Sequence, residues 1–242
     1  MANNPLVGAW ELVSDSSAGV LIYTGSHYAT VSAPKNRRRS AGDQATPGEA
    51  LDALLTSPAL SGTYTVSGSA ITHARLANTR AERSDQPLVA DHTIDGGTMT
   101  FNVMSGASST NAGASLTWRR IPSGGAGGPL VGAWEMVDDA RQGILIYTET
   151  HYAGVFRQKE RNLPKGDQYT PEEALEAISA VGAATGTYTI SGNILTAERI
   201  ANLRPTDVGV TIVQEFTVEG DTLSLRGVSG IRPGEMNWRR VS

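Results

Sequence analysis

Residues 5–11 read Pro-Leu-Val-Gly-Ala-Trp-Glu, and the same seven residues return unchanged at positions 129–135. Other landmarks recur at the same distance of 124 positions, and near the end Trp-Arg-Arg at 118–120 returns at 238–240, a distance of 120. Solenoid repeats are about 20–50 residues long, so a repeat of this length predicts a duplicated domain. We expect two homologous units, 5–122 and 129–242, joined by the Gly-rich linker 123–128, with four residues missing from the last hairpin of the second unit.

Each unit contains many short apolar runs separated by Gly-containing turns, such as 67–69 and 95–97. Such runs predict antiparallel strands in a sandwich or a closed barrel. A Thr-Pro pair with Glu three residues after the Thr predicts one helix per unit, starting after Thr46 and Thr170. In the first unit we expect strands over Leu6–Val13, Val20–Thr24, His27–Ser32, Gly62–Val66, Ala70–Asn78, Leu88–Ile94, Thr98–Met104 and Ser115–Ile121.

Composition excludes several classes of function. The 242 residues include no Cys, which rules out disulfides and thiolate chemistry, and only four His, which makes a metal site improbable. The net charge of −4 argues against sequence-independent binding of nucleic acid. No apolar run approaches a membrane span, and the first residues lack the features of a signal peptide, so we expect a cytoplasmic protein with no membrane partner. No nucleotide-binding motif is present, and we expect no cofactor.

The landmarks resemble bacterial lipocalin-like domains of the calycin superfamily. The resemblance includes Gly-x-Trp on the first strand (Gly8 and Trp10; Gly132 and Trp134) and Trp followed by Arg on the last strand (Arg119 or Arg120; Arg239 or Arg240). It implies an all-β chain of two tandem eight-stranded antiparallel barrels, each with one short α-helix, in which a last-strand Arg packs across the first-strand Trp. Lipocalin-like barrels include ligand carriers and cofactor-free enzymes, so the resemblance leaves both functions open.

Candidate catalytic residues are His and Tyr side chains of the first unit. His92 occupies the position of Phe216, and strand alternation predicts that it points into the barrel. His73 occupies the position of Ala197, and His27 and Tyr23 belong to segments that are identical in both units. An imidazole near its ordinary pKa and a phenol can act as acid–base groups. Each residue also has a structural interpretation: His27 as a hydrogen-bonding residue at a hairpin, and the others as core residues.

Candidate binding residues are shared between the units. Arg75 and Arg199 would be buried on equivalent strands and need either an acidic partner or an anionic ligand, and an internal ion pair is the more common solution. Tyr28, Tyr147 and His151 complete the candidate binding residues. A basic loop precedes each helix, with Arg37 in one unit and Arg161 in the other; it is either solvated or an electrostatic funnel for an anion.

These observations predict a cofactor-independent isomerase, cyclase or lyase/dehydratase that acts on a hydrophobic substrate with an anionic or carbonyl group. The alternatives are a non-catalytic carrier of a hydrophobic small molecule and a structural tandem; the chain would be an internal pseudo-dimer, with a homodimer also open. We place the functional cavity in the first barrel because four positions carry smaller or more polar residues there. Thr30, Ser32, His73 and His92 face Gly154, Phe156, Ala197 and Phe216 in the second unit.

Overall fold

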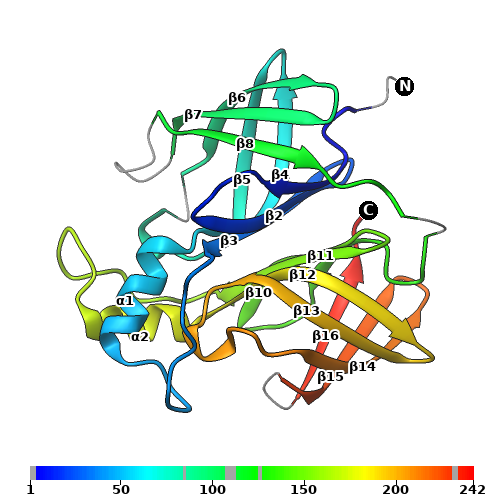
Figure 1. Cartoon of the computed structure of the whole chain (residues 1–242). Coiled ribbons are helices and arrows are strands. Elements are labelled where there is room, and N and C mark those ends of the chain that lie inside the picture. The colour runs from blue at the N-terminus through cyan, green and yellow to red at the C-terminus, as the bar shows by residue number, and fades with distance from the viewer. Residues whose placement is uncertain (1–3, 84–85, 107–112, 125–126, 231–233) are drawn as a thin grey trace.

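The strands of each unit pair antiparallel in sequence order, and the last strand pairs with the first, which closes each sheet into a barrel (Figure 1). The computed structural model describes residues 4–83, 86–106, 113–124, 127–230 and 234–242. The first barrel consists of β1 (Gly8–Leu12), β2 (Ser17–Tyr23), β3 (His27–Pro34), β4 (Ala59–Ser67), β5 (Ala70–Asn78), β6 (Leu88–Asp95), β7 (Thr98–Ser105) and β8 (Ser115–Arg120).

The second barrel repeats this topology. It consists of β9 (Gly132–Met136), β10 (Arg141–Tyr147), β11 (His151–Gln158), β12 (Val181–Ser191), β13 (Ile194–Asn202), β14 (Ile212–Glu219), β15 (Thr222–Ser229) and β16 (Glu235–Arg240). The connection between β7 and β8 covers 106–114 and its counterpart covers 230–234, so the four missing residues fall where the sequence placed them. The expected all-β class with two eight-stranded barrels is confirmed. Of the linker, positions 125–126 lie outside the described residues.

One α-helix lies between the third and fourth strands of each barrel: α1 (Pro47–Thr56) and α2 (Pro171–Ser179). Both begin with a capping box, in which the N-cap Thr and the Glu three residues later satisfy each other's backbone amides. Short 3₁₀ turns, η1 (Ala81–Arg83) and η2 (Pro205–Asp207), follow the fifth strands. None of the helices in the described part of the chain is long and apolar enough to cross a membrane.

Strand β4 begins at Ala59, three residues before the expected start at Gly62, because the chain passes through a bulge rather than starting there. At Gly62 the neighbouring backbone comes so close that a Cβ atom would lie 2.0 Å from the carbonyl oxygen of Ala74. Gly186 in β12 meets the same constraint, 1.7 Å from the carbonyl oxygen of Glu198. Gly62 therefore marks a position within β4 where the backbone of the neighbouring strand comes close. The glycine that the sequence predicts as the start of the strand belongs to this bulge.

The floor of each barrel is built from the first-strand Trp. Trp10 is fully buried, donates from Nε1 to the carbonyl oxygen of Leu6 at 2.8 Å, and lies under the guanidinium of Arg120, 4.1 Å from the ring centroid. Trp134 and Arg240 repeat the arrangement at 4.0 Å. The expected Arg-over-Trp packing is thereby confirmed for the second Arg of each Trp-Arg-Arg sequence.

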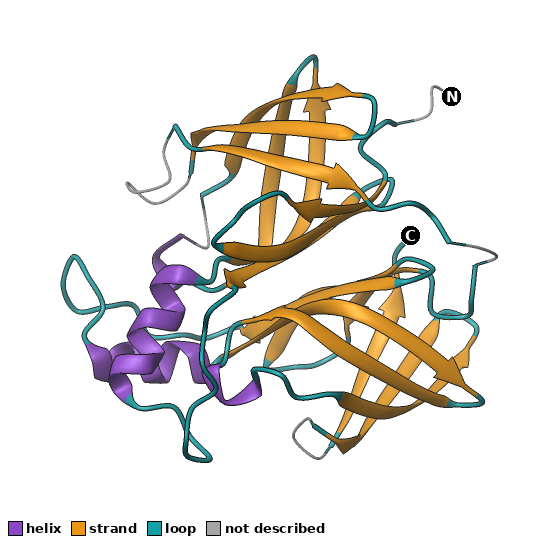
Figure 2. Cartoon of the chain, viewed as in Figure 1, coloured by secondary structure: helices purple, strands orange, loops and turns teal. Residues whose placement is uncertain are grey.

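The two barrels pack against each other through the outer faces of their second and third strands (Figure 2). Small and β-branched side chains fill this contact, and the set is nearly symmetric: Ala9, Val20, Ile22 and Ala29 from one barrel and Ala133, Ile144, Ile146 and Ala153 from the other. At one end of the interface α1 packs on α2, around buried Leu54 and Ile178. Each barrel therefore buries part of its outer surface against its twin.

Reciprocal arginines extend this interface. Arg37 donates to the backbone carbonyls of Asn202 and Leu203 at 3.1 and 3.2 Å. Arg161, the counterpart of Arg37, donates to the carbonyl of Asn78, the counterpart of Asn202, at 2.7 Å. Equivalent residues thus make equivalent contacts in both directions, as around an approximate two-fold axis. Neither basic loop is a solvated loop or a funnel at these residues; both dock onto the other barrel.

Replacement of Trp10 by Ala should lower the free energy of unfolding by about 3–5 kcal/mol, because a fully buried aromatic is lost together with its Arg120 contact. Chemical denaturation monitored by circular dichroism measures the change. The exposed Val137→Ala substitution is the control and should stay within about 0.5 kcal/mol of the parent. An unaltered denaturation midpoint for Trp10→Ala would place the barrel floor elsewhere.

A protease recognition sequence introduced into the 123–128 linker should allow cleavage without separation of the barrels. The apolar strand faces and the arginine contacts hold the two halves together independently of the linker. Size-exclusion chromatography should give one peak at the position of the intact chain before and after cleavage. Two peaks of half the mass after cleavage would contradict the interface.

Candidate functional site

The first barrel encloses a cavity of about 550 Å³, whereas the equivalent space in the second barrel is about 100 Å³. The larger cavity opens at the end of the barrel where β1 meets β2, β5 meets β6 and α1 ends, opposite the Trp10 floor. Its apolar wall includes Leu12, Leu21, Leu60, Phe101, Val103 and Trp118. The first barrel, in which the sequence predicts the functional cavity, thus has the larger of these two cavities, and the functional role of that cavity stays a prediction.

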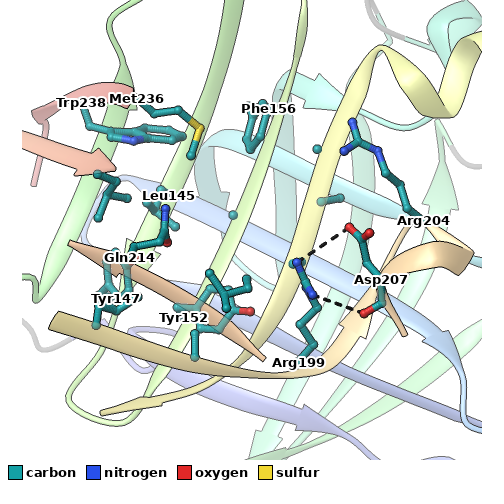
Figure 3. Close-up of a pocket in the computed structure, with 18 residues that line it drawn as sticks. Leu145, Tyr147, Tyr152, Phe156, Arg199, Arg204, Asp207, Gln214, Met236 and Trp238 are labelled. Carbon is teal, nitrogen blue, oxygen red and sulfur yellow. Dashed lines mark hydrogen bonds and ion pairs between the residues drawn. The ribbon is translucent and has the colours of Figure 1, made fainter. Parts of the chain in front are cut away.

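One aromatic side chain occupies space in the second barrel at a position that is open in the first. In the second barrel Phe156 points into the lumen and packs edge-on against Trp238, with ring centroids 6.1 Å apart (Figure 3). Gly182 leaves room for this ring, since a Cβ atom there would lie 2.2 Å from the Phe156 Cζ atom. The first barrel has Ser32 and Pro58 at these two positions, and both line its open cavity. The pair Phe156 and Gly182 is therefore a matched plug that the first barrel lacks.

A buried Tyr–His pair lies on the wall of the first cavity. His73 Nε2 is 2.7 Å from the Tyr23 hydroxyl, and the ring of Tyr28 packs edge-on against His73 at 4.4 Å. Burial lowers the pKa of His73 to about 3, outweighing the backbone carbonyl of Leu88, which favours the protonated ring. Burial raises the pKa of Tyr23 well above its ordinary value. The pair is therefore uncharged at neutral pH. In the second barrel Ala197 replaces the imidazole.

Tyr28 adds a buried hydroxyl to the same wall, and this hydroxyl makes no hydrogen bond within the protein. Burial raises its pKa, and the charge of Arg75 opposes the shift, so the phenol and the guanidinium lie close enough to interact. The Tyr152 hydroxyl in the second barrel is equally without a partner. The Tyr28 phenol is a hydrogen-bond donor available to a bound molecule.

Three arginines, Arg75, Arg80 and Arg83, line the first cavity. Arg75 donates to the backbone carbonyls of Arg83 and Gly106, and burial lowers its pKa. Arg80 pairs with Glu82 at 3.2 Å, and Glu82 also accepts a hydrogen bond from Tyr169 of the second barrel. None of the described residues that line the cavity is acidic.

Arg199 occupies the position of Arg75 in the second barrel, and its charge is neutralised by an acidic residue of the same barrel. Its Nη2 atom lies 3.7 Å from a carboxylate oxygen of Asp207, as the dashed line in Figure 3 marks, and its side chain is only 4 % exposed. The internal ion pair expected for both arginines is thus present in the second barrel. For Arg75 no carboxylate of the described residues lies within ion-pair distance.

The structure places three of the expected histidines away from the cavity. His92 Nδ1 lies 2.6 Å from the backbone oxygen of Ser69 at the β4–β5 turn, toward the closed end, and His92 is not among the residues that line the cavity. His27 and His151 lie at the hairpins beside Ser26 and Thr150, and burial lowers the pKa of each. The inward position of His92 in its strand does not bring the imidazole to the cavity, because the ring is held at the Ser69 carbonyl.

The other sequence-based candidates line one of the two cavities. His73, Tyr23, Tyr28 and Arg75 meet in the first barrel, and Tyr147 lines the small space of the second together with Arg199. The sequence analysis missed Arg80 and Arg83. The signal for Arg83 was present, since its counterpart in the repeat is Asp207, a reversal of charge.

Comparisons of the chain with protein-family models, with curated proteins and with solved structures gave no match. Function must therefore be argued from the cavity itself. Within the described residues no group of three or more His, Asp or Glu side chains is placed to hold a metal ion.

The neutral state of His73 predicts a pH-dependent stability. The unfolded chain binds a proton at this position below its ordinary pKa of 6.5, and the folded chain does so only below about 3. The folded state therefore binds fewer protons in this interval, and its stability is complete above pH 6.5 and falls as the pH is lowered. Between pH 7 and 5, wild type should lose about 2 kcal/mol more than His73→Ala, measured by denaturation at each pH.

The Ala variant reproduces Ala197 of the second barrel, and the other titrating groups, including His27 and His151, are common to both proteins. Equal losses in the two proteins would mean that His73 is solvated and titrates normally.

Proposed function

We propose that the first barrel binds a hydrophobic small molecule non-covalently and that the chain is a tandem lipocalin-like binding protein. The observation that carries this proposal is the contrast between two copies of one barrel, with about 550 Å³ open in one and about 100 Å³ in the other. Both copies have the same floor and the same strand topology. The larger open lumen is therefore a property of the first copy and not of the fold. The Arg-over-Trp floor and the up-and-down closure support the lipocalin-like assignment.

The chemistry of the cavity suits a largely apolar ligand. Its volume falls in the range of about 300–1,000 Å³ that small-molecule sites occupy, and such sites combine an apolar wall with a few fixed polar groups. The polar groups here are the Tyr23–His73 pair, the Tyr28 hydroxyl and the arginines at the open end. Val13 and Leu55 are exposed at the rim, which gives the entrance an apolar edge.

Binding is favoured over catalysis because of the state of His73. A general acid or base works best when its pKa lies near the ambient pH, and burial holds the pKa of His73 near 3. Tyr23 and Tyr28 remain neutral phenols for the same reason. The isomerase, cyclase or lyase alternative retains one supporting observation, the unpartnered Tyr28 hydroxyl, which could polarise a substrate carbonyl.

The uncharged fluorophore N-phenyl-1-naphthylamine, which brightens in apolar surroundings, tests the proposal directly. Wild type should bind it with saturable fluorescence enhancement. The double variant Ser32→Phe with Pro58→Gly transfers the plug of the second barrel into the first, so it should lose at least about tenfold in affinity, or about 1.4 kcal/mol.

Met236→Leu in the second barrel is the matched control, since it introduces the residue that the first barrel has at Leu116, and it should leave binding unchanged. Circular dichroism verifies the fold of each variant. A wild type that does not bind the fluorophore, or a plugged variant that binds it as tightly as wild type, would contradict the proposal.

A further inference from the structure

The same backbone cradle holds one arginine in each barrel. Arg75 donates to the carbonyls of Arg83 and Gly106, and Arg199 donates to those of the equivalent Asp207 and Gly230. The arginines thus lie on equivalent strands, β5 and β13, and their guanidinium groups are held by equivalent carbonyls of the 3₁₀ turns and of the residues that follow β7 and β15. What differs is the side chain at the first of these positions, a carboxylate in the second barrel and a guanidinium in the first.

This exchange reverses the charge next to the cavity. In the second barrel Asp207 neutralises Arg199 at 3.7 Å. In the first barrel the side chain at this position is a cation. Burial lowers the pKa of the Arg75 guanidinium, the charge of Arg83 lowers it further, and Tyr28 and Glu82 oppose the shift. A carboxylate placed beside Arg75 would supply the negative charge that Asp207 supplies beside Arg199.

The cavity composition points the same way. Its described lining includes three arginines and no Asp or Glu, whereas the smaller space of the second barrel is lined by Arg199, Arg204 and Asp207. Among the described residues, Glu82 is an acidic side chain that interacts with Arg75, and it is already engaged by Arg80 and Tyr169. The first barrel therefore presents a partly buried cation with no carboxylate of its own at ion-pair distance.

We infer that the ligand of the first barrel carries a carboxylate, which pairs with Arg75 in the place that Asp207 takes beside Arg199. This inference rests on the proposed binding function and narrows the ligand to a hydrophobic monocarboxylate. The apolar body lies along Leu21, Phe101 and Trp118, and the carboxylate faces the open end. Tyr28, whose hydroxyl is unpartnered and close to Arg75, is a second donor to it.

Displacement of N-phenyl-1-naphthylamine by decanoate and by 1-decanol tests the inference, because the two competitors share one chain and differ in the headgroup. At a pH where decanoate is ionised, wild type should prefer decanoate by about tenfold or more, the usual worth of a charge-assisted hydrogen bond. Without a cationic subsite the less water-soluble alcohol would be the stronger competitor.

Arg83→Asp reproduces the second barrel's ion pair, and it should abolish the preference for decanoate while the uncharged fluorophore still binds. Arg83→Gln, which removes the cation without supplying a carboxylate, should give an intermediate preference and serves if the Asp variant does not fold. Asp207→Asn in the second barrel is the control and should retain the full preference of wild type.

The outcomes separate the two proposals. Failure of wild type to bind the fluorophore overturns the binding function and this inference with it. If the fluorophore binds and decanoate and 1-decanol displace it equally well, the binding function stands and the inference that the ligand carries a carboxylate is overturned. A preference for decanoate that persists undiminished in Arg83→Asp would place the anion away from Arg75 and overturn the assignment of this subsite.

Discussion

The packing of β2 and β3 against β10 and β11 is the contact on which the rest of the structure depends. These strands are buried on both faces, since one face lines a barrel and the other meets the twin barrel. Val20, Leu21, Ile22 and Tyr23 are consequently all buried, although alternate residues point in opposite directions. A surface strand of a barrel would normally alternate between apolar and polar residues. The unbroken apolar run at 20–23, repeated at 144–147, commits the duplicated barrels to each other and fixes where the helices and the arginine loops meet.

The two copies have kept what closes a barrel and changed what fills it. Both retain the Trp under an Arg, the bulge glycine, the capped helix and the arginine in its carbonyl cradle. The differences gather at inward positions near one end: Ser32 against Phe156, His73 against Ala197 and Arg83 against Asp207. In the second copy Phe156 fills lumen volume and Asp207 neutralises Arg199, while Ala197 removes a buried imidazole. In the first copy the Tyr28 hydroxyl makes no hydrogen bond within the protein and Arg75 has no carboxylate of the described residues at ion-pair distance. Together with the larger cavity, this is the basis for proposing that one barrel binds the ligand.

The sequence predicted the closed barrels, the Arg-over-Trp floor and the barrel with more space, because each depends on local patterns or on a comparison of the two copies. It could not predict where the imidazole of His92 lies. His92 has the inward position of its strand, and its cross-strand partner Phe101 lines the cavity, yet the imidazole meets the Ser69 carbonyl instead. It also could not assign Arg37 and Arg161, because their partners are backbone carbonyls of the other barrel, more than 80 residues away in the chain. Every residue has a backbone carbonyl, so the amino-acid sequence does not indicate which carbonyl accepts a hydrogen bond from a given arginine.

Arg37 links the two barrels in a way that bears on the open end of the cavity. The same guanidinium that reaches Asn202 and Leu203 also bonds the hydroxyls of Thr56 and Ser57, where α1 ends. Thr56, with its neighbours Leu54 and Leu55, borders the cavity entrance. The rim of the first barrel is therefore anchored to the second, which contributes rigidity to an opening it does not line. The second barrel therefore has a structural role although its own lumen is nearly filled. Without it, Arg37 and the end of α1 at the cavity entrance would lose their contacts with Asn202 and Leu203.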